Sequence, residues 1–205
     1  MTPMPTMPEC RISITDFVDF VTRAGMPKLT KVRQLKHRGE YHAYSDFYRG
    51  IREAIINAHA HERGKLSIGP AAIAAIEVDK RRRHYDALIT AYVGWWGRKK
   101  LEWFTPEQAV RRFEGFHLRI NPELGLSIDG VPHIIKLHFK EAPLSKRYSE
   151  VLACIMYESY PLPPSAEIAV LDIRRRRLHR LSPRPELSAL VAGELAAFSA
   201  MWARA

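Results

Sequence analysis

Three basic side chains alternate along an apolar segment whose pattern is typical of a β-strand. Lys136, His138 and Lys140 stand two residues apart, so in a strand they project from the same face. Lys146 and Arg147 follow at the start of an expected helix, whose free amide groups favour an anion. These five residues predict an anion-binding site. The plainer alternative is a charged sheet face that only meets solvent.

Two runs of adjacent cations are further candidate contacts for a polyanion. They are Lys80, Arg81, Arg82 and Arg83 in the first run and Arg174, Arg175, Arg176 and Arg177 in the second. The first run opens an expected helix on which Trp95 should be exposed, so it combines charge with a ring that can stack on bases. The second run is expected at a hairpin tip. The alternative for the first run is a helix face that only meets solvent. The alternative for the second run is a charged sheet edge that prevents aggregation.

The chain as a whole is basic. It has 205 residues, with 32 Lys and Arg against 22 Asp and Glu, which gives a formal net charge of +10 at pH 7. This balance excludes an acidic solvating protein and favours nucleic acid or another polyanion as a partner. Hydrophobic residues make up 46% and charged residues 26%, a composition typical of a globular domain.

Other chemistries lack their sequence signatures. Cys10 and Cys154 are far apart and match no zinc-ligand spacing or disulfide framework, so we expect a reducing, cytoplasmic location. No nucleophile elbow, dinucleotide fingerprint or Walker A motif occurs. We therefore expect no resident metal and no cofactor. No apolar stretch approaches the roughly 18 residues that cross a bilayer, and the N-terminus does not resemble a signal peptide.

The period of the apolar pattern changes near Gly97. Before this residue, spacings of three and four predict helices, over residues 13–24, 45–61, 71–79 and 80–96. Residues 26–43 show no clean period. After Gly97, alternation predicts strands, over residues 100–104, 116–120, 124–128, 133–139, 167–173 and 178–181. Asp129 and Gly130 are expected to form a hairpin turn, and two more helices are expected over residues 145–157 and 185–202.

These elements predict an α+β fold. We expect an N-terminal helical layer, then a mixed, mainly antiparallel sheet with flanking helices and a C-terminal helix. Residues 1–12 should be a flexible tail and residues 13–205 one domain, with a helical part over 13–97 and an α/β core over 98–205. The last helix is apolar enough to need burial, either on the sheet or against a second subunit, so a homodimer is an open alternative.

The order of elements from Lys80 onward is helix, three or four strands in a meander, helix and strand. This αβββαβ order resembles the core of the PD-(D/E)xK nuclease-like superfamily, over residues 80–175. The resemblance implies an acid at the end of the second core strand and an acid-x-Lys set on the third. In that superfamily the acids bind Mg²⁺ and the lysine helps to orient the attacking water.

The superfamily pattern is incomplete in this chain. Asp129 stands in the place of the first acid, although an Asp-Gly turn also favours aspartate for local reasons. If Lys136 is the superfamily lysine, Ile134 occupies the acid position, and if Lys140 is, His138 does. The resemblance therefore implies a degenerate core that does not cleave.

Glu123 could supply the missing ligand if its side chain lies on the Lys136 side of the sheet. A Mg²⁺-dependent nuclease that uses Asp129, Glu123 and Lys136 or Lys140 is thus the alternative reading of the same resemblance.

Three short segments also resemble an uncharacterised bacterial family of hypothetical proteins, which implies no activity. They are Asp46-Phe47-Tyr48 with Arg52-Glu53, residues 121–125 and residues 136–140. Three functions follow from the sequence: a nucleic-acid-associated protein without cleavage chemistry, a Mg²⁺-dependent nuclease, and an interaction protein that dimerises through its C-terminal helix.

Overall fold

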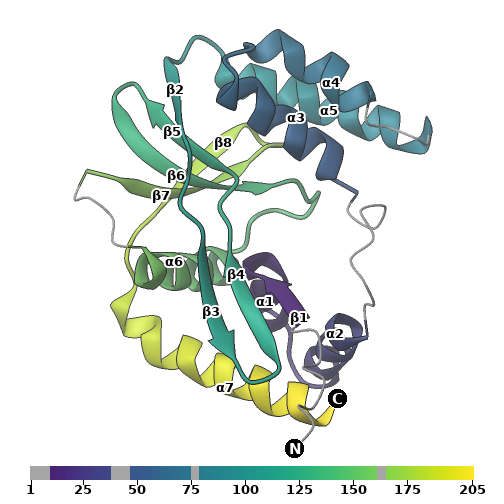
Figure 1. Cartoon of the computed structure of the whole chain (residues 1–205), viewed down its shortest axis with the longest axis vertical. Coiled ribbons are helices and arrows are strands. Elements are labelled where there is room, and N and C mark those ends of the chain that lie inside the picture. Colours follow the sequence, from purple (N-terminus) through teal and green to yellow (C-terminus); the bar gives the residue numbers. More distant parts are fainter. Residues whose placement is uncertain (1–9, 38–46, 75–78, 161–164) are drawn as a thin grey trace, which may run out of the picture.

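The computed structural model describes residues 10–37, 47–74, 79–160 and 165–205, with only the backbone for residues 79–83. These residues form seven α-helices and two mixed sheets, which is the predicted α+β class (Figure 1). The switch from helices to strands falls after Trp96, close to Gly97 as predicted.

The larger sheet has five strands. Their order is β2 (Leu101–Phe104), β5 (Leu124–Ile128), β6 (Val131–His138), β7 (Glu167–Asp172) and β8 (Arg177–Leu181). Only β6 and β7 run parallel, and helix α6 (Lys146–Ser159) supplies the crossover that a parallel pair needs. Asp129 and Gly130 turn the chain between β5 and β6 with φ of 50° and 90°, which confirms the predicted hairpin.

A second, three-stranded sheet was not expected. Its order is β1 (Cys10–Ser13), β4 (Phe116–Ile120) and β3 (Ala109–Phe113), with β1 parallel to β4. The prediction of a tail over residues 1–12 is therefore wrong for residues 10–12, whereas residues 1–9 lie outside the described part. Both unexpected strands are short, and their pairing with β4 rather than a local pattern makes them strands.

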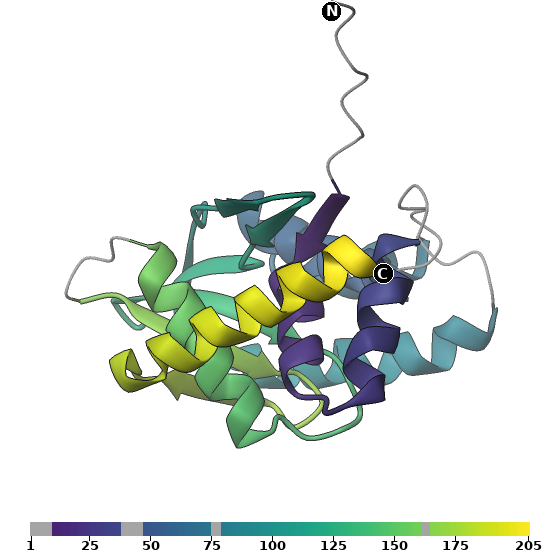
Figure 2. The same cartoon turned by 90° about the horizontal axis from the view of Figure 1, so that it is seen from below.

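Helices cover both faces of the five-stranded sheet. On one side, α6 lies on the sheet, α1 (Ile14–Val21) and α7 (Ser188–Arg204) pack against α6, and α2 (Met26–Lys36) packs against α1 and α7. On the other side lie α3 (Arg49–Ala60), α4 (Ile68–Ala74) and α5 (Asp79–Trp96). Figure 1 shows the two groups above and below the strands, and Figure 2 shows α7 crossing the lower group. Ile134 and Ile135 are neighbours on β6, yet each lies in a different hydrophobic cluster.

Two local predictions for the helices were wrong. Helix α2 forms where no period was visible, because only Val32 and Leu35 are buried on it. Trp95 is 4% exposed instead of solvent-facing, because it continues the buried series Tyr85, Leu88 and Tyr92 at spacings of three and four. Residues 45 and 46 of the expected helix over 45–61 lie outside the described residues, and so do residues 75–78 of the expected helix over 71–79.

The apolar face of α7 is covered within the chain. Val191, Leu195, Phe198 and Trp202 are buried, and the Phe198 ring lies 5.0 Å from that of Phe20 on α1. A second subunit is therefore not needed to bury this helix, and the homodimer stays a prediction without that support. In the described part of the chain, no helix combines the length and apolar character needed to cross a bilayer.

Gly125 gives a direct test of the sheet. A Cβ atom at this position would lie 2.3 Å from the Phe104 carbonyl oxygen on β2, so Gly125→Ala should overpack the strand pair and cost about 1–3 kcal/mol. Gly193 on α7 is the control, because a Cβ atom there meets nothing within 4 Å and alanine favours a helix by about 1 kcal/mol. Urea unfolding should show the two substitutions changing stability in opposite directions, and equal effects would contradict this packing.

His59 should make the stability depend on pH. Its ring is buried against Trp96, its Nε2 lies 2.7 Å from the Tyr92 hydroxyl, and burial lowers its pKa from 6.5 to about 4. As the pH falls from 6.5 towards 4, the unfolded chain binds a proton that the folded chain refuses, so about 3 kcal/mol of stability is lost. Urea unfolding across this range should show the loss in the wild type and a smaller one in His59→Gln.

Candidate functional site

Glu123 and Lys136 form an ion pair inside the protein. The antiparallel register pairs Leu124 with Ile135, so the residue before β5 stands opposite Lys136. Lys136 Nζ lies 2.7 Å from Glu123 Oε1 and donates to the Asn121 carbonyl at 2.8 Å. Glu123 is 8% exposed and Lys136 4%. Glu123 therefore does lie on the Lys136 side of the sheet.

The second oxygen of Glu123 replaces a missing strand partner. The Leu137 amide donates to Glu123 Oε2 at 2.9 Å, at a point where β5 has not yet begun. The Arg52 side chain reaches from α3 to 3.6 Å from Glu123 Oε1 and lies over the Phe139 ring at 5.6 Å. Both carboxylate oxygens of Glu123 are thus occupied by groups of this chain.

Asp129 is not part of this cluster. It occupies the far end of β5, six residues from Glu123, which corresponds to about 20 Å at the rise of a β-strand. Its carboxylate accepts from the Lys100 amide at 3.3 Å and its φ is 50°. The turn explains this aspartate, and Asp129 does not converge with Glu123 and Lys136 as the nuclease alternative would require.

The donor set does not suit Mg²⁺, which prefers several oxygen ligands in an octahedron. Ile134 fills the acid position beside Lys136 and is buried in the core. Over residues 10–37, 47–74, 79–160 and 165–205, no three His, Cys, Asp or Glu side chains are grouped so that they could hold a metal ion.

The expected basic row on β6 is not an open anion site. His138 is 7% exposed and its Nε2 lies 2.9 Å from the Ala142 carbonyl oxygen, whereas Lys140 binds Asp19 at 2.7 Å. Helices cover both sheet faces, so Lys136 and His138 do not reach solvent as the alternation suggested, whereas Lys140 lies beyond the end of β6 and is exposed.

The two cations that open α6 also have acidic neighbours. Lys146 lies 3.8 Å from Glu150 and Arg147 3.5 Å from Glu194. Ser145 caps the helix as expected, since its side chain accepts from the Tyr148 amide. The helix start therefore holds paired charges on the surface.

The arginine run at the β7–β8 turn divides into two pairs. Arg174 donates to the Phe139 carbonyl at 2.9 Å, and Arg175 binds the fully buried Asp172 at 3.1 Å. These two side chains hold the turn against β6. Arg176 and Arg177 are exposed, and no ion pair is recorded for them with the residues that the structure describes.

The other arginine run is only partly visible. Lys80, Arg81, Arg82 and Arg83 lie in the first turns of α5, where the structure describes the backbone alone, so their side chains fall outside the described part. Their predicted role stays a prediction.

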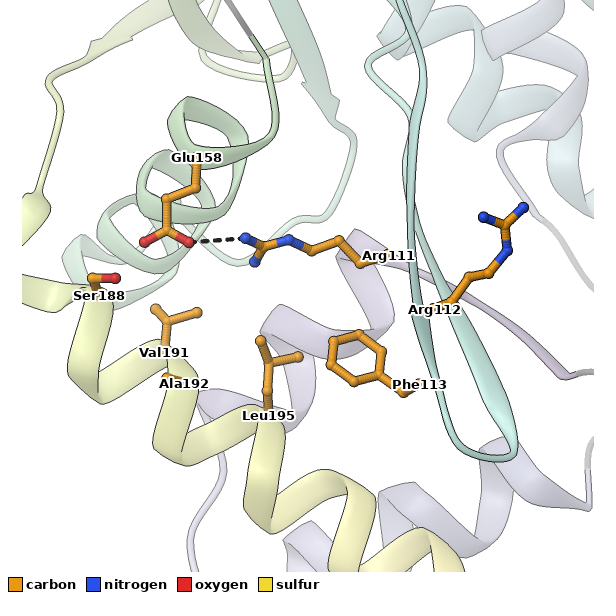
Figure 3. Close-up of a pocket in the computed structure, with 8 residues that line it drawn as sticks. All are labelled: Arg111, Arg112, Phe113, Glu158, Ser188, Val191, Ala192 and Leu195. Atoms are coloured by element: carbon orange, nitrogen blue, oxygen red, sulfur yellow. Dashed lines mark hydrogen bonds and ion pairs between the residues drawn. The ribbon is translucent and has the colours of Figure 1, made fainter.

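A surface pocket of about 540 Å³ between β3 and α7 escaped the sequence analysis (Figure 3). Arg111 reaches across it to Glu158 at 3.2 Å, and the Ser188 hydroxyl lowers the pKa of that carboxyl. Burial raises the pKa of the adjacent Cys154 thiol to about 12, so it is not a ready nucleophile. The pocket could not be foreseen, because β3 itself was not.

Comparisons with family models, with curated proteins and with solved structures give no significant match to this chain. The resemblances to the nuclease-like superfamily and to the uncharacterised bacterial family therefore stay predictions.

The ion pair can be tested by a double-mutant cycle. Lys136→Met leaves the Glu123 charge buried without its main partner and should cost about 3–5 kcal/mol. Adding Glu123→Gln removes that charge while keeping an acceptor for the Leu137 amide, so the double variant should be more stable than Lys136→Met alone. Urea unfolding measures the cycle, and losses that simply add would show that the two side chains are not coupled.

Proposed function

We propose that this protein associates with nucleic acid and does not cleave it. The observation that carries the proposal is the closed Glu123–Lys136 pair. Lys136 stands at the position that the resemblance gives to the lysine beside the metal and the phosphodiester, and Glu123 is the acid that could have replaced the missing ligand. Here the Lys136 ammonium group donates to the Glu123 carboxylate and to the Asn121 carbonyl. Neither Lys136 nor Glu123 is therefore available to bind a substrate.

The topology supports the link to a nuclease-like core. Strands β2, β5 and β6 are antiparallel neighbours in the five-stranded sheet, and α6 then crosses over to β7, which lies parallel to β6. After a first helix, α5, this matches an αβββαβ core in which β3 and β4 are inserted between β2 and β5 and pair in the other sheet. Common topologies host many functions, so the choice of nucleic acid rests on charge as well.

The charge supports a polyanion partner. The chain carries ten more cations than anions, and much of the internal pairing uses its acids: Asp19, Glu123 and Asp172 each bind a cation. Exposed arginines such as Arg176 and Arg177 remain for an external partner. Phosphate groups are the acceptors that guanidinium binds best.

The proposal predicts that the protein binds nucleic acid, that this binding weakens as the salt concentration rises, and that the nucleic-acid strands stay uncut. The full chain should shift a short labelled DNA duplex at low salt, with log affinity falling by about 0.9 per log salt for each phosphate neutralised. Fluorescence anisotropy gives the slope, and denaturing gels with Mg²⁺ or Mn²⁺ should show full-length strands.

Two results would count against this proposal. Binding that is undetectable at low salt would remove the association with nucleic acid. Metal-dependent cleavage that disappears in both Asp129→Asn and Lys136→Met, with both variants folded, would instead favour the nuclease alternative.

A further inference from the structure

The three-stranded sheet has two unlike faces. Its inner face packs on the core through Phe116, Leu118 and Ile120 of β4. The cross-strand register places Arg11 of β1 and Arg112 of β3 on either side of His117, so the three side chains form one row on the outer face. Arg119 and Val110 belong to the next outward row.

The arginines of the outer face are exposed, and the described part of the chain gives them no acidic partner. Arg11, Arg112 and Arg119 are all solvent-exposed, and no ion pair is recorded for them among residues 10–37, 47–74, 79–160 and 165–205. Arg111, which points inward from the same strand, binds Glu158. In Figure 3 Arg111 reaches towards Glu158 while Arg112 points away on the other side of β3.

Grouping like charges in this way opposes folding. Arg119 is the diagonal neighbour of both Arg11 and Arg112, which is within reach of long side chains, so the guanidinium groups repel one another. A carboxylate at any of these positions would relieve the repulsion. Val110, 48% exposed, adds an apolar side chain to the same face. A bound anion would offset the repulsion between the arginines and so stabilise a face of this composition.

The spacing of the arginines suits a duplex. Neighbouring strands lie about 4.8 Å apart, so Arg11 and Arg112 start about 10 Å from each other, between the widths of the two DNA grooves, which are about 6 and 12 Å. Two flanking guanidinium groups can therefore bind phosphates on both sides of a groove. The outer rows carry no Phe, Tyr or Trp, so they do not favour base stacking on a single strand.

We infer that the outer face of the β1–β4–β3 sheet binds the phosphate backbone of a nucleic-acid duplex through Arg11, Arg112 and Arg119. This inference rests on the proposed function and names its surface. The strands lie at the upper margin of the folded body in Figure 2, and Glu123 and Lys136 take no part in the contact.

The test compares two triple variants of the full chain. Arg11→Thr, Arg112→Thr and Arg119→Thr remove the three outer cations and keep a residue that suits strands. The control is Arg23→Thr, Arg63→Thr and Arg98→Thr, which removes the same charge from exposed positions on other elements. Thermal unfolding establishes whether both triple variants are folded. If one of them is not, its three single substitutions are measured instead. The probe is a short labelled DNA duplex, with the matching single strand as a second arm.

The outer-face triple should flatten the plot of log affinity against log salt by about 2.7, which is about 0.9 for each of three lost phosphate contacts. The control triple should keep the wild-type slope, and the single strand should bind more weakly than the duplex. Equal slopes in both triples, with the wild type still binding, would overturn this surface but leave the proposed function standing. Tighter binding of the single strand would overturn the choice of a duplex, and a wild type that binds neither probe would overturn surface and function together.

Discussion

A lysine buried in the middle of a sheet has to be paired. Strand β6 is covered by helices on both faces, and Lys136 lies within it at 4% exposure. A buried ammonium without a partner would cost several kcal/mol, so the Glu123 carboxylate and the Asn121 carbonyl are required where they are. The bend of the chain between β4 and β5, which separates the two sheets, brings both groups to that place.

This requirement also determines which cations can meet a partner. Lys136 and Arg175 bind buried carboxylates, and Lys140 binds Asp19, so they stabilise the protein instead of contacting a ligand. Among the residues that the structure describes, three arginines without an ion pair lie on the outer face of the smaller sheet. A positive net charge therefore indicates a binding surface only after the cations that form ion pairs within the protein have been excluded.

The larger sheet was predictable from sequence, and its neighbour was not. Strands β5 to β8 alternate clearly or lie in apolar runs, and Asp129-Gly130 is a strong local turn signal. Strands β1 and β3 have four and five residues and exist because β4 pairs with them, which is a non-local effect. For that reason the sequence did not predict that Arg11, His117 and Arg112 lie in one row.

The candidate site was predicted in part for the same reason. Alternation left open whether Glu123 lies on the Lys136 side, and the register of β5 against β6 decides that it does. The burial of Lys136 and His138 could not be read from alternation, since it depends on α6 and α1 packing over that face. Asp129 was predicted correctly as a turn residue, but the sequence alone could not exclude a catalytic role for it, because an aspartate suits both.

The most direct measurement is amide hydrogen exchange of the full chain with and without a DNA duplex, in the presence of Mg²⁺. If the protein binds a duplex on the outer face without cutting it, the amides of residues 109–120 should gain protection and both DNA strands should be recovered at full length. Amide exchange that the duplex leaves unchanged would contradict this account. Protection centred on residues 121–123 and 136–140, together with shortened DNA strands, would contradict it as well.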